Sequence, residues 1–158
     1  MKKIKKILAP TDLSELSKIG LRHALEMGAS EGASVLVYHV IAPLQEWLAR
    51  HDDFFFSAQE LVEERKRMLA KFLKESFADL LSRGLVQQEV EVGVPHKRIV
   101  EKAEEESADL IVMSTHGRSG LLDMMVGSVT EKVVRGATCP VLSIRPAKAA
   151  GQMQTSAA

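Results

Sequence analysis

The segment from Ser114 to Ser128 contains the residue types best suited to hold an anion. Gly117 and Gly120 carry no Cβ, so the backbone around them can approach a ligand closely. Gly127 and Ser128 stand where a helix is expected to begin. The unpaired N–H groups and positive dipole end of such a helix favour a negative charge. A loop of exposed amides that leads into a helix start therefore predicts a phosphate-binding site.

Side chains in the same segment would add hydrogen-bond donors, namely the Arg118 guanidinium and the hydroxyls of Ser119 and Ser128. In the alternative interpretation, the glycines only allow turns and Ser128 only caps the helix. The sequence contains neither Gly-x-x-x-x-Gly-Lys-Ser/Thr nor Gly-x-Gly-x-x-Gly. A Walker-type ATPase and a Rossmann dehydrogenase are therefore not supported.

Four further residues carry groups that could do chemistry. Asp12 either contacts a ligand or caps the next helix. His116 is a possible general base, but no carboxylate lies near it in the sequence, and the alternative is that it orients its loop. His39 lies within an apolar run, where a hydrogen-bonded core histidine is expected. Cys139 precedes a proline at the start of an expected strand and is interpreted as structural.

These candidate residues lie between strand-length apolar runs and longer segments of helical period. The expected strands are 4–10, 35–40, 86–92, 109–114 and 140–144, and the third alternates as an edge strand does. Expected helices follow an N-cap at Thr11 and Asp12, a capping box at 57–60, Pro95, and a second capping box at 128–131. Gly28 and Gly32 are expected to end the first helix, and Gly84 the second.

Alternation of strands and helices indicates an open, mostly parallel sheet with helices on both faces, the three-layer α/β/α class. Ligands bind to such sheets beyond the carboxyl ends of the strands, where the strand order reverses. The loops at 10–13, 40–43 and 114–128 are therefore the expected site.

Composition narrows the possible function further. The chain has 158 residues, 46% of them hydrophobic, and its 21 basic and 21 acidic side chains balance. A balanced charge argues against a dedicated nucleic-acid binder, and no apolar run is long enough to span a bilayer. The single cysteine excludes an intramolecular disulfide and a cysteine-based zinc site. We expect a cytoplasmic protein with one domain over residues 1–146 and a disordered tail at 147–158.

One irregular segment, residues 42–57, concentrates aromatic side chains. Trp47 and the run 54–56 supply four of the seven aromatic residues in the chain. They either cover the edge of the core or form a lid or a partner surface.

Several ordered motifs resemble the universal stress protein family over about residues 1–146. The matching stretches are 7–14, 39–40, 93–95 with Ile99, 109–120, 127–129 and 139–142. The nucleotide-binding branch of that family carries Gly, two residues, Gly, nine residues, Gly and then Ser or Thr. In this sequence Gly117 is the second glycine and Gly127-Ser128 closes the pattern, whereas Ser114 replaces the first glycine.

The resemblance implies a doubly wound, flavodoxin- or Rossmann-like sheet with strand order 3-2-1-4-5. It also implies a role for each matched position. Pro10, Thr11 and Asp12 would contact the nucleoside, with Asp12 near the ribose or a metal-bound phosphate, and the backbone of Val40 would meet the adenine. The ribose and phosphate path would be lined by Met113, Ser114, Gly117, Arg118 and Gly120, and the phosphates would be held by Gly127, Ser128 and Val129.

The resemblance further implies that the ligand is ATP or another adenine nucleotide, bound together with Mg²⁺. It implies a homodimer through the last strand, Val141–Arg145, and a stress-response sensor or switch that acts on a protein partner. Two alternatives remain at this point. One is a slow ATP hydrolase or adenylyl-transfer relative that uses Asp12 and His116, and the other is a nucleotide-free protein-interaction module.

Overall fold

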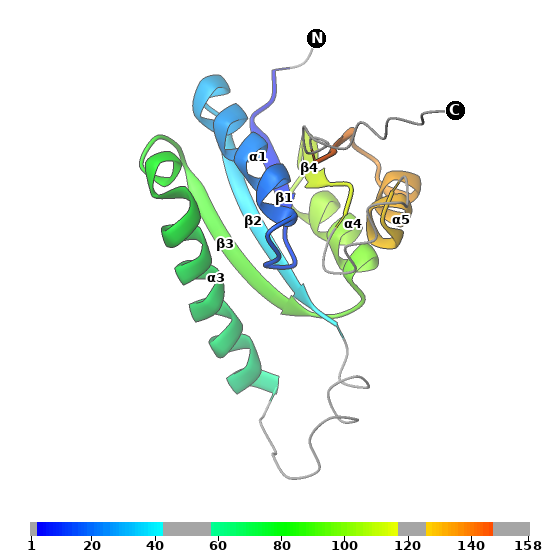
Figure 1. The fold of residues 1–158 in the computed structure, drawn as a ribbon. Helices are drawn as coiled ribbons and strands as arrows, with labels where there is room; N and C mark the ends of the chain where they lie inside the picture. Colours follow the sequence, from blue (N-terminus) through cyan, green and yellow to red (C-terminus); the bar gives the residue numbers. More distant parts are fainter. Residues whose placement is uncertain (1–2, 43–57, 117–125, 147–158) are drawn as a thin grey trace, which may run out of the picture.

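A five-stranded parallel sheet forms the centre of the computed structural model, which describes residues 3–42, 58–116 and 126–146 (Figure 1). The strands are β1 (Lys6–Pro10), β2 (Ser34–Ile41), β3 (Val86–Val92), β4 (Leu110–Ser114) and β5 (Val141–Ile144). Their order in the sheet is β3-β2-β1-β4-β5, and all four pairings are parallel. The predicted fold class and strand order are confirmed. The order reverses between β1 and β4, which lie side by side although about a hundred residues separate them.

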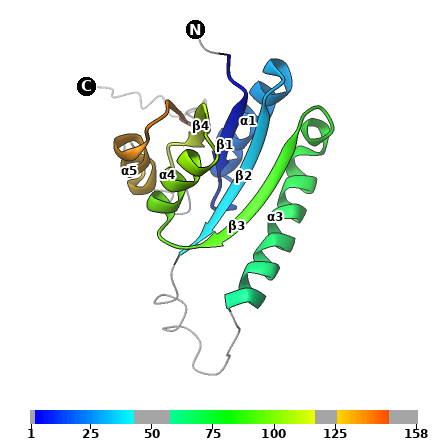
Figure 2. The same cartoon turned by 180° about the vertical axis from the view of Figure 1, so that it is seen from behind.

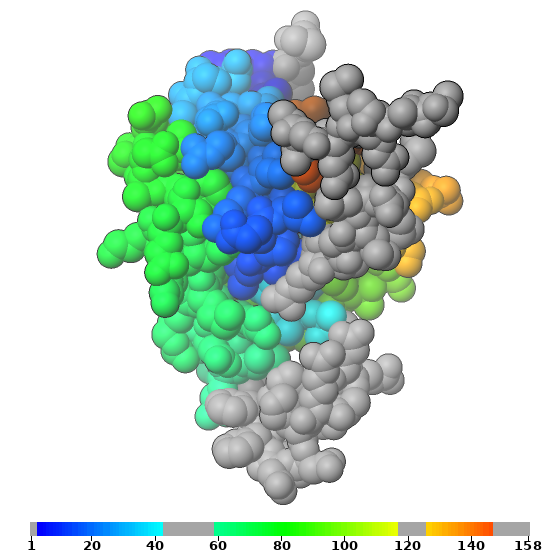
Figure 3. Space-filling model, viewed as in Figure 1, coloured from blue at the N-terminus to red at the C-terminus, as the bar shows by residue number. Residues whose placement is uncertain are grey.

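Within the described ranges, four helices cover the two faces of the sheet (Figures 1 and 2). They are α1 (Ser17–Glu31), α3 (Ala58–Leu81), α4 (Pro95–Glu105) and α5 (Ser128–Gly136). The helices α1 and α3 lie on one face, and in the space-filling view their atoms, blue and green, lie side by side on it (Figure 3). The helices α4 and α5 lie on the other face.

Successive side chains of each strand point to opposite faces of the sheet, so the apolar core is divided between the two faces. On β1, Ile7 and Ala9 pack with α1 and α3, whereas Leu8 packs with α4 and α5. Because β1 and β4 are buried on both faces, their sequences are nearly continuous runs of apolar residues. β3 is an edge strand, as its alternating sequence predicts, and is buried mainly at Val90.

Helix starts differ from the sequence prediction. Asp12 does not cap α1, because the helix begins only at Ser17, with Leu16 in the N-cap position and no side-chain cap. Between them the Asp12 carboxylate accepts hydrogen bonds from the Ser14 amide and hydroxyl at 3.0 and 2.6 Å. The capping box at 128–131 does not form either, because the N-cap of α5 is Gly127. At the first helix a short side-chain turn at Asp12 thus takes the place of the expected cap, and α5 begins without a side-chain cap.

Gly32 alone ends α1. It has φ +67°, the left-handed conformation that glycine adopts readily, whereas Gly28 lies inside the helix. The α3 helix ends at Leu81, close to the predicted end. The aromatic segment 43–57, the glycine loop 117–125 and the C-terminal residues 147–158 lie outside the described residues. Within the described part of the chain, no helix is long and apolar enough to cross a membrane.

Candidate nucleotide site

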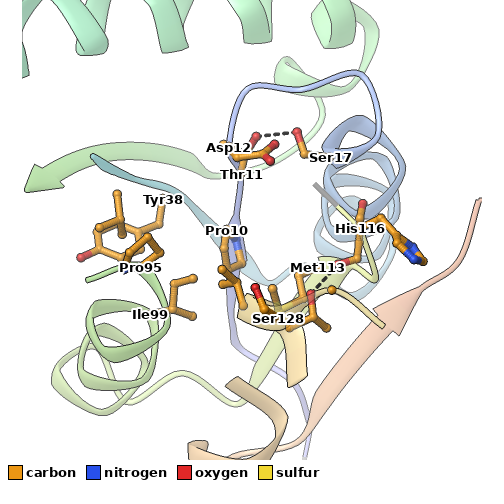
Figure 4. Close-up of a pocket in the computed structure, with 15 residues that line it drawn as sticks. Pro10, Thr11, Asp12, Ser17, Tyr38, Pro95, Ile99, Met113, His116 and Ser128 are labelled. Atoms are coloured by element: carbon orange, nitrogen blue, oxygen red, sulfur yellow. Dashed lines mark hydrogen bonds between the residues drawn. The ribbon is translucent and has the colours of Figure 1, made fainter. Parts of the chain in front are cut away.

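A cavity of about 300 Å³ opens where the sheet order reverses, between the carboxyl ends of β1 and β4 and the first turns of α4 and α5 (Figure 4). Its volume lies at the lower end of the range for small-molecule sites. The lining residues include nine of the predicted ones, namely Pro10, Thr11, Asp12, Val40, Met113, Ser114, Gly127, Ser128 and Val129. Residues from three separate predicted loops thus meet at one cavity, as the topology requires.

The α5 helix presents its N-terminus to this cavity. The Gly127 amide is already used, because it donates to the Thr115 carbonyl at 2.6 Å. Within the described ranges, no hydrogen-bond acceptor pairs with the amides of Ser128, Val129 or Thr130. These three groups are the first-turn donors that a helix leaves without intrahelical partners. They are available to an anion, and the helix dipole adds to the attraction.

Gly127 is required by close packing rather than by a special backbone conformation. A Cβ at this position would lie 2.9 Å from the Thr115 carbonyl oxygen. That carbonyl also accepts the Gly127 amide, so a side chain would push the start of α5 away from the end of β4. The conformation at Gly127 is extended, with φ −69°.

The end of β1 is held by a short network. The Thr11 hydroxyl bonds to the Ser17 hydroxyl at 2.8 Å and accepts the Leu13 amide at 3.0 Å. The Thr11 amide donates to the Tyr38 carbonyl, and the Thr11 carbonyl is bonded to Nδ1 of His39, both at 2.9 Å. His39 is therefore a satisfied core histidine, as expected. The network fixes Asp12 at the rim of the cavity.

Ser114 ties β4 to α1. Its hydroxyl donates to the Leu16 carbonyl at 2.7 Å and accepts the Gly20 amide at 2.9 Å. The Ser114 carbonyl accepts the Thr130 hydroxyl at 3.0 Å. A Cβ on Gly20 would lie 2.5 Å from the Ser114 amide, so α1 can approach β4 this closely only with glycine at position 20. The serine at this strand end therefore has a structural role.

His116 is buried, and its Nδ1 is hydrogen-bonded to the Thr115 hydroxyl at 2.8 Å. In Figure 4 its imidazole lies on the opposite side of Met113 from Pro95 and Ile99 and points away from them. Asp12 lies on a different loop. The loop that follows His116 lies outside the described residues, so its orienting role stays a prediction.

One wall of the cavity is apolar. Pro10, Val40 and Met113 were predicted from the sequence, whereas Tyr38, Pro95 and Ile99 were not. The last two lie in the first turns of α4, which follows β3. The signal for them was present, because the Gly93–Pro95 turn lies at the same sheet edge as the other three loops. Burial, with a hydrogen bond to Glu91, raises the pKa of Tyr38 and keeps its hydroxyl protonated.

Three predicted site residues, Gly117, Arg118 and Gly120, lie outside the described residues. Among the described residues, no three His, Cys, Asp or Glu side chains cluster closely enough to hold a metal ion. Asp12 is the carboxylate among the lining residues. This donor set suits a Mg²⁺ ion that is bound mainly through phosphate oxygens and water.

Fold and cavity together define a doubly wound α/β protein with a cavity at its topological switch point. The sequence pattern of the universal stress protein family matches residues 3–145. The chain therefore belongs to the universal stress protein family.

Individual relatives agree with this assignment. Universal stress protein MJ0577 of Methanocaldococcus jannaschii is 32% identical over 155 residues, covering 89% of this chain and 94% of the relative. Its solved structure superposes with a TM-score of 0.73, covering 93% of this chain and 99% of that one. Universal stress protein MJ0531 of the same organism is 35% identical over 152 residues, covering 91% and 84% of the two chains.

Two more distant solved structures share the fold and contain nucleotides. One is a universal stress protein in complex with cAMP, at 21% identity and a TM-score of 0.64, covering 92% of this chain and all of that one. The other is a family protein from Arabidopsis thaliana with AMP bound, at 16% identity and a TM-score of 0.56, covering 96% and 97%.

Proposed function

We propose that this protein binds an adenine nucleotide, ATP with Mg²⁺, in the cavity between β1, β4, α4 and α5. The observation that carries the proposal is the division of the cavity into two ends. An apolar wall stands on one side, and three helix-start amides without partners among the described residues stand on the other. A ligand with an aromatic base and a phosphate chain matches this division.

Each end of the nucleotide has its proposed contacts. The base packs on Val40, Pro95 and Ile99, and the backbone of Val40 supplies its hydrogen bonds. The amides of Ser128 and Val129 bind phosphate oxygens, with Gly117, Arg118 and Gly120 contributing from their loop. Asp12 lies near the ribose or the Mg²⁺ ion. Mg²⁺ reduces the charge on the phosphates and leaves this chain's amides to orient them.

Family membership and the two nucleotide complexes support the same ligand class. Those complexes contain cAMP and AMP, and they demonstrate that the fold can accommodate adenine nucleotides. The triphosphate and the metal in this chain are our proposal. They rest on the number of first-turn amides in α5.

We further propose that the bound nucleotide acts as a signal in a stress response and that the protein works as a homodimer. The outer edge of β5 supports a dimer, because Leu142 is 37% exposed and Ser143 is also exposed. An edge strand with open backbone groups can pair with a second copy. Nucleotide binding at β4 and α5 would then bias the neighbouring dimer surface toward a partner-competent state.

Equilibrium titration of the purified protein tests the proposed function. ATP should bind with one site per chain, and Mg²⁺ should tighten the binding. Nucleotide released from the purified protein by acid should contain adenine. Incubation with Mg²⁺-ATP, followed for ADP and AMP, separates a binding protein from a hydrolase. Lack of ATP, ADP and AMP binding by the wild type would overturn the proposal.

A further inference from the structure

A compact charge network lies behind the apolar wall of the cavity. We call it the Glu91 cluster, and it consists of Tyr38, Glu89, Glu91, Arg98 and Lys102. Glu91 on β3 accepts the Tyr38 hydroxyl at 2.7 Å, Nη2 of Arg98 at 2.5 Å and Nζ of Lys102 at 2.6 Å. Lys102 also pairs with Glu89 at 2.8 Å. The cluster joins the edge strand β3 to helix α4.

The cluster is partly buried, and each of its charged side chains is ion-paired. The Lys102 side chain is only 7% exposed, and Glu91 is 25% exposed. Burial raises the pKa of Glu91, but hydrogen bonds from Lys102, Tyr38 and Arg98 lower it by more, to about 2. Glu91 therefore stays ionised at neutral pH. Loss of one member of such a buried pair leaves an uncompensated charge and forces local rearrangement.

Glu91 does not line the cavity, yet it contacts the wall of the cavity in two ways. First, it holds the hydroxyl of Tyr38, a residue of the cavity lining whose side chain is fully buried behind the wall. In Figure 4 the Tyr38 ring lies beside Pro95, and its oxygen points away from Pro10 and Met113. The buried ring therefore supports the wall from behind, packed in the same core cluster as Ile99 and Met113.

Second, Glu91 anchors α4. Arg98 and Lys102, the two α4 cations of the cluster, flank Ile99, which lines the cavity one turn from Pro95. Nζ of Lys102 also lies 5.5 Å from the centroid of the Tyr38 ring, within cation–π range. The position of the apolar wall thus depends on ion pairs that a ligand does not touch.

We propose that Glu91 is a positioning residue that sets the base selectivity of the nucleotide site, an inference that rests on the proposed function. By holding Tyr38 and α4, Glu91 keeps a flat apolar wall at the distance that a purine fills. A purine contacts more of that wall than a pyrimidine does. Displacement of the wall therefore costs purine affinity more than pyrimidine affinity.

Calorimetric titration with ATP and CTP tests the proposal in wild type, Glu91→Gln and Glu101→Gln. Glu101 also pairs with Arg98, but it is 53% exposed and lies on α4 itself rather than on β3, so it is the matched control. Glu91→Gln should weaken ATP binding about tenfold and CTP binding by less than about threefold. Glu101→Gln should keep both affinities within about twofold of wild type.

A second variant covers the case in which Glu91→Gln does not fold. Tyr38→Phe keeps every ion pair and nearly the same volume, and it removes only the tether to Glu91. It should lower the ATP-to-CTP preference in the same direction. The proposal is overturned if both variants keep the wild-type ratio of ATP affinity to CTP affinity, or if they lose affinity for the two nucleotides equally. Lack of nucleotide binding by the wild type overturns the proposed function itself.

Discussion

Ser114 shows how one side chain can replace a glycine in a nucleotide pattern without filling the site. The glycine pattern that this sequence resembles has Gly at this position. The Ser114 hydroxyl points to α1, where it bridges the Leu16 carbonyl and the Gly20 amide. The bridge lies at the first turn of α1, between groups that are four residues apart and would otherwise pair with each other. The serine therefore adds a link between α1 and β4.

Ser114→Gly should lower the free energy of unfolding by about 1–2 kcal/mol, since it removes the bridge and adds backbone freedom. The loss in free energy is limited because the Leu16 carbonyl can then accept the Gly20 amide directly. ATP affinity should stay within about threefold of wild type, a difference below about 0.7 kcal/mol. Urea unfolding and calorimetry measure the two quantities. Ser114→Ala, which keeps the backbone restriction, should lose less stability. A large gain in ATP affinity in either variant would contradict this role.

The ionisation of Glu91 leads to a second prediction at the residue scale, which concerns the stability of the protein at acid pH. Its pKa in the folded protein is about 2, below its ordinary value of 4.5. A lowered carboxyl pKa contributes stability that is present above the unfolded-state pKa and is lost as pH falls through the folded-state pKa. The contribution is about 3 kcal/mol at most. Glu91→Gln should therefore be less stable than wild type at pH 7, and the difference should shrink between pH 5 and pH 2.

Urea unfolding at pH 7, 5, 4 and 3 checks this expectation. Glu63→Gln is the control, because Glu63 is an exposed helix residue paired with Lys66, and its replacement should change stability little. A constant difference between wild type and Glu91→Gln across this pH range would show that the ionisation of Glu91 does not stabilise the fold.

At the scale of elements, β5 is the edge strand through which we propose that the dimer forms. Its backbone bonds to β4 through alternate residues, since the carbonyls of Pro140 and Ile144 accept the Ile111 and Thr115 amides. The amides of Val141 and Ser143 therefore face the open edge of the sheet. Proline at 143 would remove an edge donor and leave the β4 ladder in place.

Ser143→Pro should convert the proposed dimer to a monomer, because strand pairing across the edge needs that amide. Light scattering after gel filtration measures the mass. Ser143→Val keeps the donor and favours a strand, and it should remain dimeric. Monomeric wild type, or a dimeric Ser143→Pro variant, would contradict a β5 interface.

The order of elements could be predicted from the sequence because each strand is a short apolar run and helices separate the runs. The helix starts were predicted less well. Thr11, Asp12 and Ser128 have the composition of caps, but Asp12 bonds to Ser14 in a turn and Ser128 already lies inside α5. Local hydrogen bonds of this kind compete with capping, and the choice depends on the approach of α1 to β4. That approach is a tertiary contact.

At the scale of the whole molecule, parallel topology explains why the predicted site residues meet. All carboxyl ends of the strands lie at one edge, so loops far apart in the sequence converge there. Tyr38 and Ile99 were missed because in the sequence they look like core residues, one in a strand and one in a helix. Their contribution depends on how α4 packs on the sheet, through its core side chains and through the ion pairs of Arg98 and Lys102 with Glu91.

The central claim, that the amides at the start of α5 bind phosphate, suggests a substitution at Ser128, which is exposed at the first position of the helix. Gly127 is unsuitable, since a Cβ there would lie 2.9 Å from the Thr115 carbonyl oxygen. An aspartate at 128 complements the helix dipole and should stabilise the helix by about 0.3–1 kcal/mol. The same carboxylate would repel a phosphate group.

ATP titration of wild type, Ser128→Asp and Ser128→Asn is therefore the most direct measurement. Ser128→Asp should bind ATP at least about tenfold more weakly, through like-charge repulsion close to the amides, while its melting temperature is not lowered. The neutral Ser128→Asn variant should stay within about threefold of wild type. Equal ATP affinity in all three proteins would contradict phosphate binding at the start of α5.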